Sequence, residues 1–439
     1  MGHPTAKETI AEPGLAALAG VCAVVMVGLA LPFYAVSTYD GGVRVPVDRW
    51  FATPLLAIEF LVVVMCLLAR WNPVASLREM PRPVRLGIAV WLAGATVSSI
   101  YAVRPDDSWL MQGIWLLHGT FAIALWSRLS GPWRSARPAW LISLTLGLLA
   151  LSAVVYAVAA VYGGDDSLPW EAFSVAVANP RHYVFYGAPL LGLAVGWLAL
   201  ANTRRQMTLA LVCLFLAYHL LAWSGGRNAL GVAIMFPAFF VLLHRPGWKR
   251  VLPACLACAT LAYPATLLTA PDRPIYGFGS SSDRLADNSY GSGVNAAGYS
   301  SGRGILWEAG FEMIRERPVA GHGQFQFDLV LDRVPDRNML PLIRHPHNAA
   351  IQFVFDWGIF ATAGLVIMLV PFALSMPRRL RTEPGVAVPA FGGLFALAMT
   401  SAFDGTYFFT APLFITAILL AALATVKLQA VRRSDSIDA

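Results

Sequence analysis

Two short polar segments carry side chains that could act on an anionic substrate. The turn WSGGR at 223–227 separates two apolar stretches, and the segment HPHN at 345–348 precedes a third. A neutral imidazole is suited to take a proton near neutral pH, and a helix N-terminus disfavours its charged form. A guanidinium group can pair two oxygens of a pyrophosphate at once. These residues predict a general base at His347 and an anion-binding group at Arg227.

Other interpretations of these residues remain open. Arg227 could be a topological charge that reaches for the membrane surface. Arg303 could bind an anion at the start of a helix or could be an ordinary solvated charge. His347 could be an interfacial polar residue. It could also share a metal ion with His345, but no third ligand is spaced to complete such a site, so we predict no metal.

The composition places the chain among integral membrane proteins. Of its 439 residues 57% are hydrophobic and 13% are charged, and the mean hydropathy is +0.61. Soluble domains have about 45–50% apolar and about 25% charged residues. We therefore expect an all-α polytopic membrane protein with about twelve transmembrane helices. The apolar stretches lie near 14–36, 50–69, 86–103, 108–127, 138–162, 183–201, 207–224, 228–243, 251–268, 349–376, 386–403 and 406–426.

The distribution of Lys and Arg predicts the orientation of these helices. Basic residues gather in alternate loops, which the positive-inside rule assigns to the cytoplasm; these clusters lie at 70–85, 128–137, 204–205, 245–250, 378–381 and 427–433. Both termini are then cytoplasmic. Basic loops beside anionic lipid also account for the net charge of +7, so it does not indicate nucleic-acid binding.

This topology divides the chain into three parts. Residues 1–268 hold nine predicted transmembrane helices, 269–348 form a long outer loop, and 349–439 hold three further helices and a cytoplasmic tail. Within the loop, the apolar spacing predicts an amphipathic helix near 303–317 that lies on the membrane surface, capped by Ser301 and closed by Pro318.

The order of motifs around this loop resembles the bacterial O-antigen ligase family. His347-Asn348, followed by nine residues and Gly358, is similar to the family's signature, although Ala361 stands where that signature has Gly, Thr or Tyr. The turn ending in Arg227 is similar to the Ser-x-Ser-Arg turn of the superfamily. The loop segments SGR at 301–303, ERP at 316–318 and GHG at 321–323 resemble its large periplasmic loop.

The resemblance implies a glycosyltransferase of lipopolysaccharide biosynthesis at the periplasmic face of the inner membrane. The donor would be O-antigen polysaccharide on undecaprenyl pyrophosphate, and the acceptor a sugar hydroxyl of lipid A-core. Transfer would be inverting and would need no cofactor or metal. His347 matches the family's base, and Arg227 and Arg303 match its cationic positions. Other expected substrate contacts are Asn348, Arg181, His182 and Arg104.

Two rival functions stay open at this point. An O-antigen polymerase or a protein O-oligosaccharyltransferase of the same superfamily would share the helices, the loop and the Arg turn, and would differ in its acceptor. A lipid or solute transporter would fit many helices with both ends inside, but transporters usually bind near the midplane through broken helices. Here the polar residues gather at the outer surface.

Overall fold

The computed structural model describes residues 47–131, 133–162, 180–270, 303–331 and 345–424 of the chain. All regular elements in these ranges are helices, which confirms the expected all-α class. The first ones are α2 (Val47–Leu68), α3 (Pro73–Glu79), α4 (Arg82–Ile100), α5 (Pro105–Ser130), η1 (Arg134–Ala136) and α6 (Arg137–Tyr162). The middle of the chain forms η3 (Pro180–Tyr183), α7 (Val184–Leu200), α8 (Arg204–Trp223), α9 (Arg227–Leu243) and α10 (Trp248–Thr269). The remaining elements are α13 (Arg303–Glu316), α14 (Phe327–Leu331), α15 (Ala349–Thr382), α16 (Pro384–Ser401), η5 (Thr406–Phe408) and α17 (Thr410–Ala424).

Many of these helices are long and apolar enough to cross a bilayer. Eight of those described pass a test of length and hydropathy, or nine if the bent pair α2 and α3 forms one span. Each predicted stretch falls on a described helix except 14–36, which lies outside the described residues. The helices α9 and α17 are shorter than a usual span. A multi-pass membrane protein is supported, whereas the predicted count of twelve is not confirmed.

Glycine contacts hold the helices that lead to the outer end of the molecule. A Cβ atom at Gly192 of α7 would collide with the Gly392 carbonyl of α16. Between α4 and α15, a Cβ at Gly87 would lie 2.5 Å from the Gly364 carbonyl oxygen. Small residues let backbones approach closely where lipid supplies no hydrophobic drive for association. Close packing therefore fixes α15 and α16, which bound the polar residues described below.

α15 is broken near its start by Gly358. This residue has φ 74° and ψ 173°, a conformation in which a side chain would be strained and would also strike the carbonyl of Val319. The break frees the carbonyls of Phe355 and Asp356, which accept from the backbone N–H groups of His322 at 2.8 Å and Gly323 at 2.9 Å. The GHG motif at 321–323 therefore anchors the outer segment on α15.

The small residue at position 361 also has a packing reason. A Cβ atom added to Gly94 of α4 would lie 2.6 Å from the Cβ of Ala361. The two backbones thus approach where both residues are small. Ala361, the departure from the family signature, fits this contact between α4 and α15.

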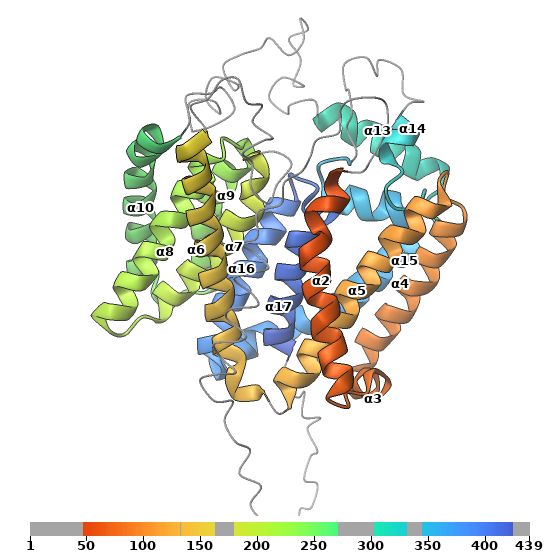
Figure 1. The fold of residues 1–439 in the computed structure, drawn as a ribbon, viewed down its shortest axis with the longest axis horizontal. Coiled ribbons are helices and arrows are strands. Elements are labelled where there is room, and N and C mark those ends of the chain that lie inside the picture. Colours follow the sequence, from red (N-terminus) through yellow and green to blue (C-terminus); the bar gives the residue numbers. More distant parts are fainter. Residues whose placement is uncertain (1–46, 132, 163–179, 271–302, 332–344, 425–439) are drawn as a thin grey trace, which may run out of the picture.

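The amphipathic helix expected near 303–317 corresponds to α13, and Figure 1 shows it with α14 at the end of the molecule opposite α3. Its buried residues Leu306, Ala309 and Met313 pack on Phe327 of α14 and Phe355 of α15. This face covers protein, whereas the sequence interpretation placed it on lipid; the half-exposed Phe311 is one apolar residue that remains outside. The predicted cap Ser301 lies outside the described residues.

Candidate active site

His347 is held in an uncommon backbone conformation at the start of α15. Its φ is 51°, in the left-handed region that non-glycine residues seldom adopt. Three contacts fix the segment. The indole Nε1 of Trp307 in α13 donates to the carbonyl of Pro346 at 2.9 Å, and the N–H of His347 donates to His345 Nδ1 at 3.3 Å. Asn348 then caps the helix. Strained residues persist where their surroundings over-determine them, and such places are often functional sites.

The side chain of His347 pairs with Asp404, which follows α16. Nδ1 of His347 lies 3.0 Å from Oδ1 of Asp404. Because an ionised carboxylate can only accept, this contact assigns the proton to Nδ1 and leaves the lone pair of Nε2 available. The His347 side chain is 29% exposed, whereas that of Asp404 is 9% exposed. The buried Asp404 therefore orients the imidazole, and the partly exposed His347 can be reached by a substrate.

Asp404 is held as an anion by donors from separate parts of the chain. Asn228 donates from Nδ2 to Oδ2 at 2.6 Å, and the N–H of Gly405 donates to Oδ1 at 2.8 Å. Burial alone would raise the pKa of Asp404, but the hydrogen bond and the charge interaction with His347 hold that pKa below its usual value. Asp404 is therefore ionised at neutral pH and can stabilise a positive charge on His347.

Arg227 adjoins this network through its chain neighbour. It is the first residue of α9, and Asn228 beside it reaches Asp404. The preceding turn is tight because Gly225 has φ 64° and the N–H of Gly226 donates to Ser224 Oγ at 3.4 Å. The WSGGR turn thus places the half-buried Arg227 one residue before the asparagine that contacts Asp404.

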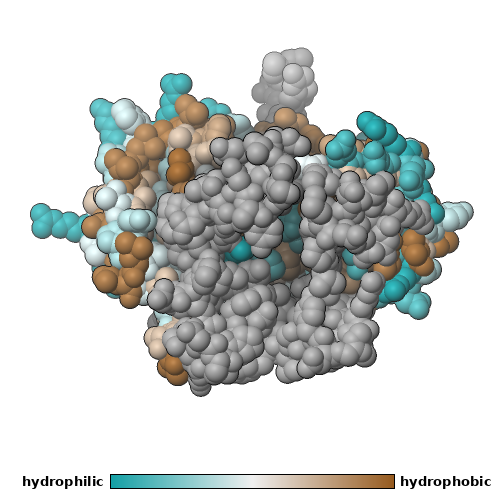
Figure 2. Space-filling view, turned by 90° about the horizontal axis from the view of Figure 1, so that it is seen from above, coloured by the Kyte–Doolittle hydropathy of each residue, from teal (hydrophilic) through white to brown (hydrophobic). Residues whose placement is uncertain are grey.

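Arg303 approaches the same cluster from α13. It is the first residue of that helix and is half-buried. Burial lowers the pKa of Arg303 while the charge of Asp404 raises it, so the guanidinium lies within electrostatic reach of this carboxylate. Residues that are far apart in the chain, Arg303 and His347, therefore meet at one end of the molecule. Figure 2 shows that end from above, with hydrophilic residues gathered on the side of α13 and α14.

His345 is buried and its ring packs against that of His347. Their ring centroids are 4.2 Å apart, and Phe408 lies 4.9 Å from the His345 ring. Burial, together with the neighbouring His347, lowers the pKa of His345 well below its usual value. It is consequently neutral, and its Nδ1 accepts the His347 N–H. This arrangement favours a positioning role for His345.

Two further residues that were predicted to contact the substrate, His182 and Arg181, lie beside the His347–Asp404 pair. His182 of η3 is half-buried, with its ring centroid 4.5 Å from that of Phe409, and contributes to the electrostatics of Asp404. Arg181 beside it is exposed, and its carbonyl borders Gly226. Both residues therefore lie beside the cluster, as expected of residues that contact the glycan donor.

Asn348 and Arg104 have structural partners instead. The amide oxygen of Asn348 accepts from Ala350 N at 2.9 Å and Ile351 N at 3.1 Å, and its Nδ2 donates to the Ala402 carbonyl. The exposed Arg104 is tied through its backbone, whose N–H donates to Gln326 Oε1 at 2.7 Å. For Asn348 the contacts favour helix capping, and for Arg104 no described contact links its side chain to His347.

A third potential metal ligand joins the two histidines in space. The ligand atoms of His345, His347 and Asp404 all lie within 4.8 Å of one another. This set could hold one ion, and the sequence interpretation missed it because Asp404 lies far along the chain. However, Asp404 already accepts hydrogen bonds from His347, Asn228 and Gly405, which account for the cluster as a hydrogen-bonded network.

Asp404 and Asn228 are the functional candidates that the sequence interpretation overlooked. Both had a detectable signal. Asn228 directly follows the Arg turn, and Asp404 stands between two apolar stretches at a place that the predicted topology puts on the same side of the membrane as the long loop. An acid on that side was the natural partner for a histidine base.

Fold and site together define a multi-pass membrane protein with a His–carboxylate pair and arginines at one end of its helical core. Residues 189–366 match the model of the family described as O-antigen ligase, so this part of the chain is similar to that family. No curated protein matches the chain. The matched region includes Arg227, Arg303 and His347, while Arg104, Arg181, His182 and Asp404 lie outside it. The expected superfamily resemblance is confirmed.

Proposed function

We propose that this protein is an O-antigen ligase. It moves O-antigen polysaccharide from undecaprenyl pyrophosphate to a sugar hydroxyl of lipid A-core, at the periplasmic face of the bacterial inner membrane. Its termini are cytoplasmic. The observation that carries the proposal is the pairing of His347 with Asp404 beside Arg227 and Arg303, within a chain whose central region matches the O-antigen ligase family.

The proposed reaction is a single displacement at the anomeric carbon of the donor. Nε2 of His347 takes the proton of the acceptor hydroxyl, and the oxygen forms a bond to that carbon. The bond from the carbon to the pyrophosphate oxygen breaks, so the configuration inverts and undecaprenyl pyrophosphate leaves with the electron pair. Asp404 holds the Nδ1 proton and stabilises the imidazolium that forms.

Arg227 and Arg303 have the complementary task. The leaving pyrophosphate gains negative charge in the transition state, and fixed guanidinium groups lower the barrier where water is scarce. Arg181 and His182 are proposed as further donor contacts, because both lie next to the turn that presents Arg227. No step in this scheme requires a metal ion or a cofactor.

The acceptor decides between this function and its relatives. Cells lacking the protein should make lipid A-core with no polymer ladder while lipid-linked polymer accumulates. Loss of an O-antigen polymerase would instead leave single repeats on the core, and loss of a protein O-oligosaccharyltransferase would leave lipopolysaccharide intact. A transporter would give no glycan transfer with purified protein, donor and acceptor. Each of these three outcomes would contradict the proposed ligase.

A further inference from the structure

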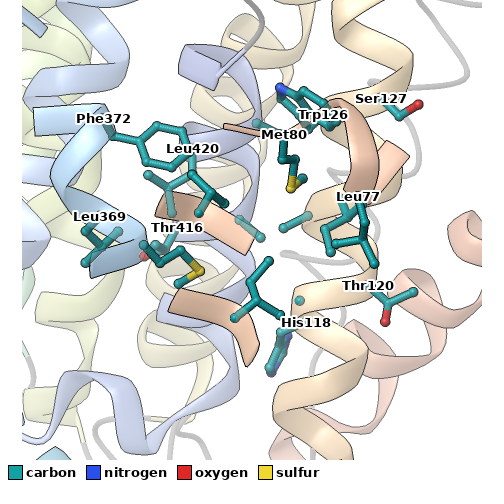
Figure 3. A pocket seen from close by; sticks show the side chains of 18 of the residues that line it. Leu77, Met80, His118, Thr120, Trp126, Ser127, Leu369, Phe372, Thr416 and Leu420 are labelled. Atoms are coloured by element: carbon teal, nitrogen blue, oxygen red, sulfur yellow. The ribbon is translucent and has the colours of Figure 1, made fainter. Parts of the chain in front are cut away.

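A large apolar cavity lies in the helical core, toward the end away from His347. Its volume is about 980 Å³, near the upper end of the range of about 300–1,000 Å³ for ligand pockets. Side chains of α3, α4, α5, α15 and α17 and of the turn after α3 line it. They include Leu77, Met80, Trp126, Leu369, Phe372 and Leu420, which surround it in Figure 3. These walls are suited to hydrocarbon.

One end of this cavity is cationic. Arg379, in the last turn of α15, lines it with 5% of its surface exposed. Its Nε donates to Ser375 Oγ at 2.9 Å, but its buried Nη1 has no hydrogen-bond partner among the described residues. Ser130, at the end of α5, also lines the cavity, and its buried Oγ likewise has no hydrogen-bond partner among the described residues. Buried polar atoms of native proteins normally have partners, so this end is prepared for a ligand.

The carboxylate of Glu383, four residues after Arg379, is already paired with other arginines. Glu383 accepts from Arg137 Nη1 at 2.5 Å and from Arg134 Nη2 at 3.3 Å. Arg379 therefore adds an excess positive charge, while the exposed Arg78 and Arg82 flank the stretch at 79–81 that borders the cavity. The exposed Glu79 at the rim opposes them only in part. This charge balance is complementary to an anionic head group.

The cavity is remote from the site proposed for pyrophosphate. Residues 359–379 of α15 rise by about 30 Å, which equals the thickness of the hydrocarbon core of a bilayer. A lipid whose phosphate lies at Arg379 belongs to the leaflet opposite His347. Its chains would run from Arg379 toward Trp91 and Trp115, along the cavity. The lipid-linked donor cannot present its pyrophosphate at both ends.

We propose that this cavity binds an anionic two-chain glycerophospholipid, whose phosphate accepts from Arg379 and Ser130 and whose chains fill the apolar space between α4, α5, α15 and α17. Basic pockets between transmembrane helices bind anionic head groups by the same chemistry. Such a lipid would lie between the closely packed pair α4–α15 and the pair α5–α17 and would add contacts between them. It would stabilise α15, the helix that begins at the His347 site.

Two glycines of α5 provide a matched pair of variants. A Cβ atom at Gly119 or at Gly113 would meet nothing within 4 Å, so a larger side chain is tolerated at both positions. Only Gly119 lines the cavity. Gly119→Trp should obstruct the cavity, and Gly113→Trp should not.

The test is native mass spectrometry of the detergent-purified full-length protein, mixed separately with phosphatidylglycerol, phosphatidylethanolamine and undecaprenyl phosphate. We expect the parent protein to retain phosphatidylglycerol in preference to the others. Gly119→Trp should abolish this retention, and Gly113→Trp should keep it. Arg379→Gln should reduce the retention of phosphatidylglycerol about tenfold, the effect of losing one charge-assisted hydrogen bond to its phosphate.

Four outcomes would overturn the proposal. They are equal retention by the parent protein and Gly119→Trp, no preference for phosphatidylglycerol, stronger retention of undecaprenyl phosphate, and no retained lipid at all. The measurement needs no glycan transfer, so its failure would leave the proposed ligase function intact. If Arg379→Gln fails to fold, the glycine pair still decides.

Discussion

Two histidine–carboxylate pairs occur in different surroundings in this molecule. His347 and Asp404 meet at one end of the helical core, with 3.0 Å between Nδ1 and Oδ1. His118 and Glu59 meet inside it, with 2.7 Å between Nδ1 and Oε1. The His118 side chain is 4% exposed and the His347 side chain 29%. The contact is similar, but His118 borders the apolar cavity of the helical core, whereas His347 lies at the outer end beside Asp404 and within reach of solvent.

The carboxylates differ as well. Asp404 accepts from Asn228 and Gly405 in addition to His347, and the Arg303 guanidinium lies within electrostatic reach. Among the described residues, Glu59 has its polar contact with His118, and it lies between helices that are candidate membrane spans. A pair becomes a candidate for catalysis when its carboxylate is fixed by independent donors and its histidine faces outward. The inner pair serves to join α2 to α5.

The largest effect is expected for His347→Ala. Loss of a general base should reduce the transfer rate about 10²–10⁴-fold, while binding of the lipid-linked donor persists. A purified assay with donor and lipid A-core measures both quantities. His118→Ala is the comparison: leaving Glu59 without its donor should lower stability by about 1–3 kcal/mol but leave the transfer rate per folded protein unchanged. Ligation that continues in His347→Ala would remove this residue from the base role.

Asp404→Asn should have the next largest effect. An amide can no longer stabilise the imidazolium, and it can present an N–H that selects the wrong tautomer of His347. We expect kcat to fall by about 10²-fold or more with little change in the KM for donor. A parallel rise in KM with an unchanged kcat would mean that Asp404 contributes to substrate binding and not to the orientation of the base.

The arginines should respond to geometry as well as to charge. Arg227→Lys and Arg303→Lys keep a cation but lose the planar fork, so each should lose most of the activity, on the order of tenfold, if it grips pyrophosphate in a bidentate manner. Arg204→Lys is the matched control, because Arg204 is exposed at the start of α8. Full activity of both variants in rate and donor-binding measurements would contradict the pyrophosphate clamp.

Chelation should have the smallest effect. The rate should survive exhaustive treatment with EDTA, because guanidinium groups can take the place of a divalent cation at pyrophosphate. This experiment can fail in a specific way, because His345, His347 and Asp404 could together hold a metal ion. Loss of activity in EDTA with recovery in Zn²⁺, Mn²⁺ or Mg²⁺ would assign these residues to a metal site.

Local patterns predicted most of the helices but few of their contacts. Apolar length is a property of a single segment, so α4 to α8, α10, α15 and α16 follow from the sequence. The amphipathic spacing of α13 likewise predicted a helix. Its apolar face was assigned to lipid because nothing local reveals that Phe355 of α15 covers it. The break at Gly358 could have been suspected from glycine alone, yet its partners at 318–323 are distant in sequence.

The candidate site shows the same limit. His347, Arg227 and Arg303 could be selected from their residue types and from family resemblance, and the structure brings each close to Asp404 or its partner Asn228. Asp404 could have been noticed as an acid between two apolar stretches, but its pairing with His347 depends on how α16 returns beside α15. The apolar cavity depends on the spacing of several helices and has no sequence signal.

The central claim is that His347 and Asp404 work as one unit in glycan transfer, and a double-mutant cycle tests it most directly. The turnover rate would be measured for the parent protein, His347→Ala, Asp404→Asn and the double variant, with equal amounts of folded protein. If Asp404 acts only through His347, the double variant should be no slower than His347→Ala. Rate losses that multiply would contradict this account, because they would show that the two side chains contribute independently.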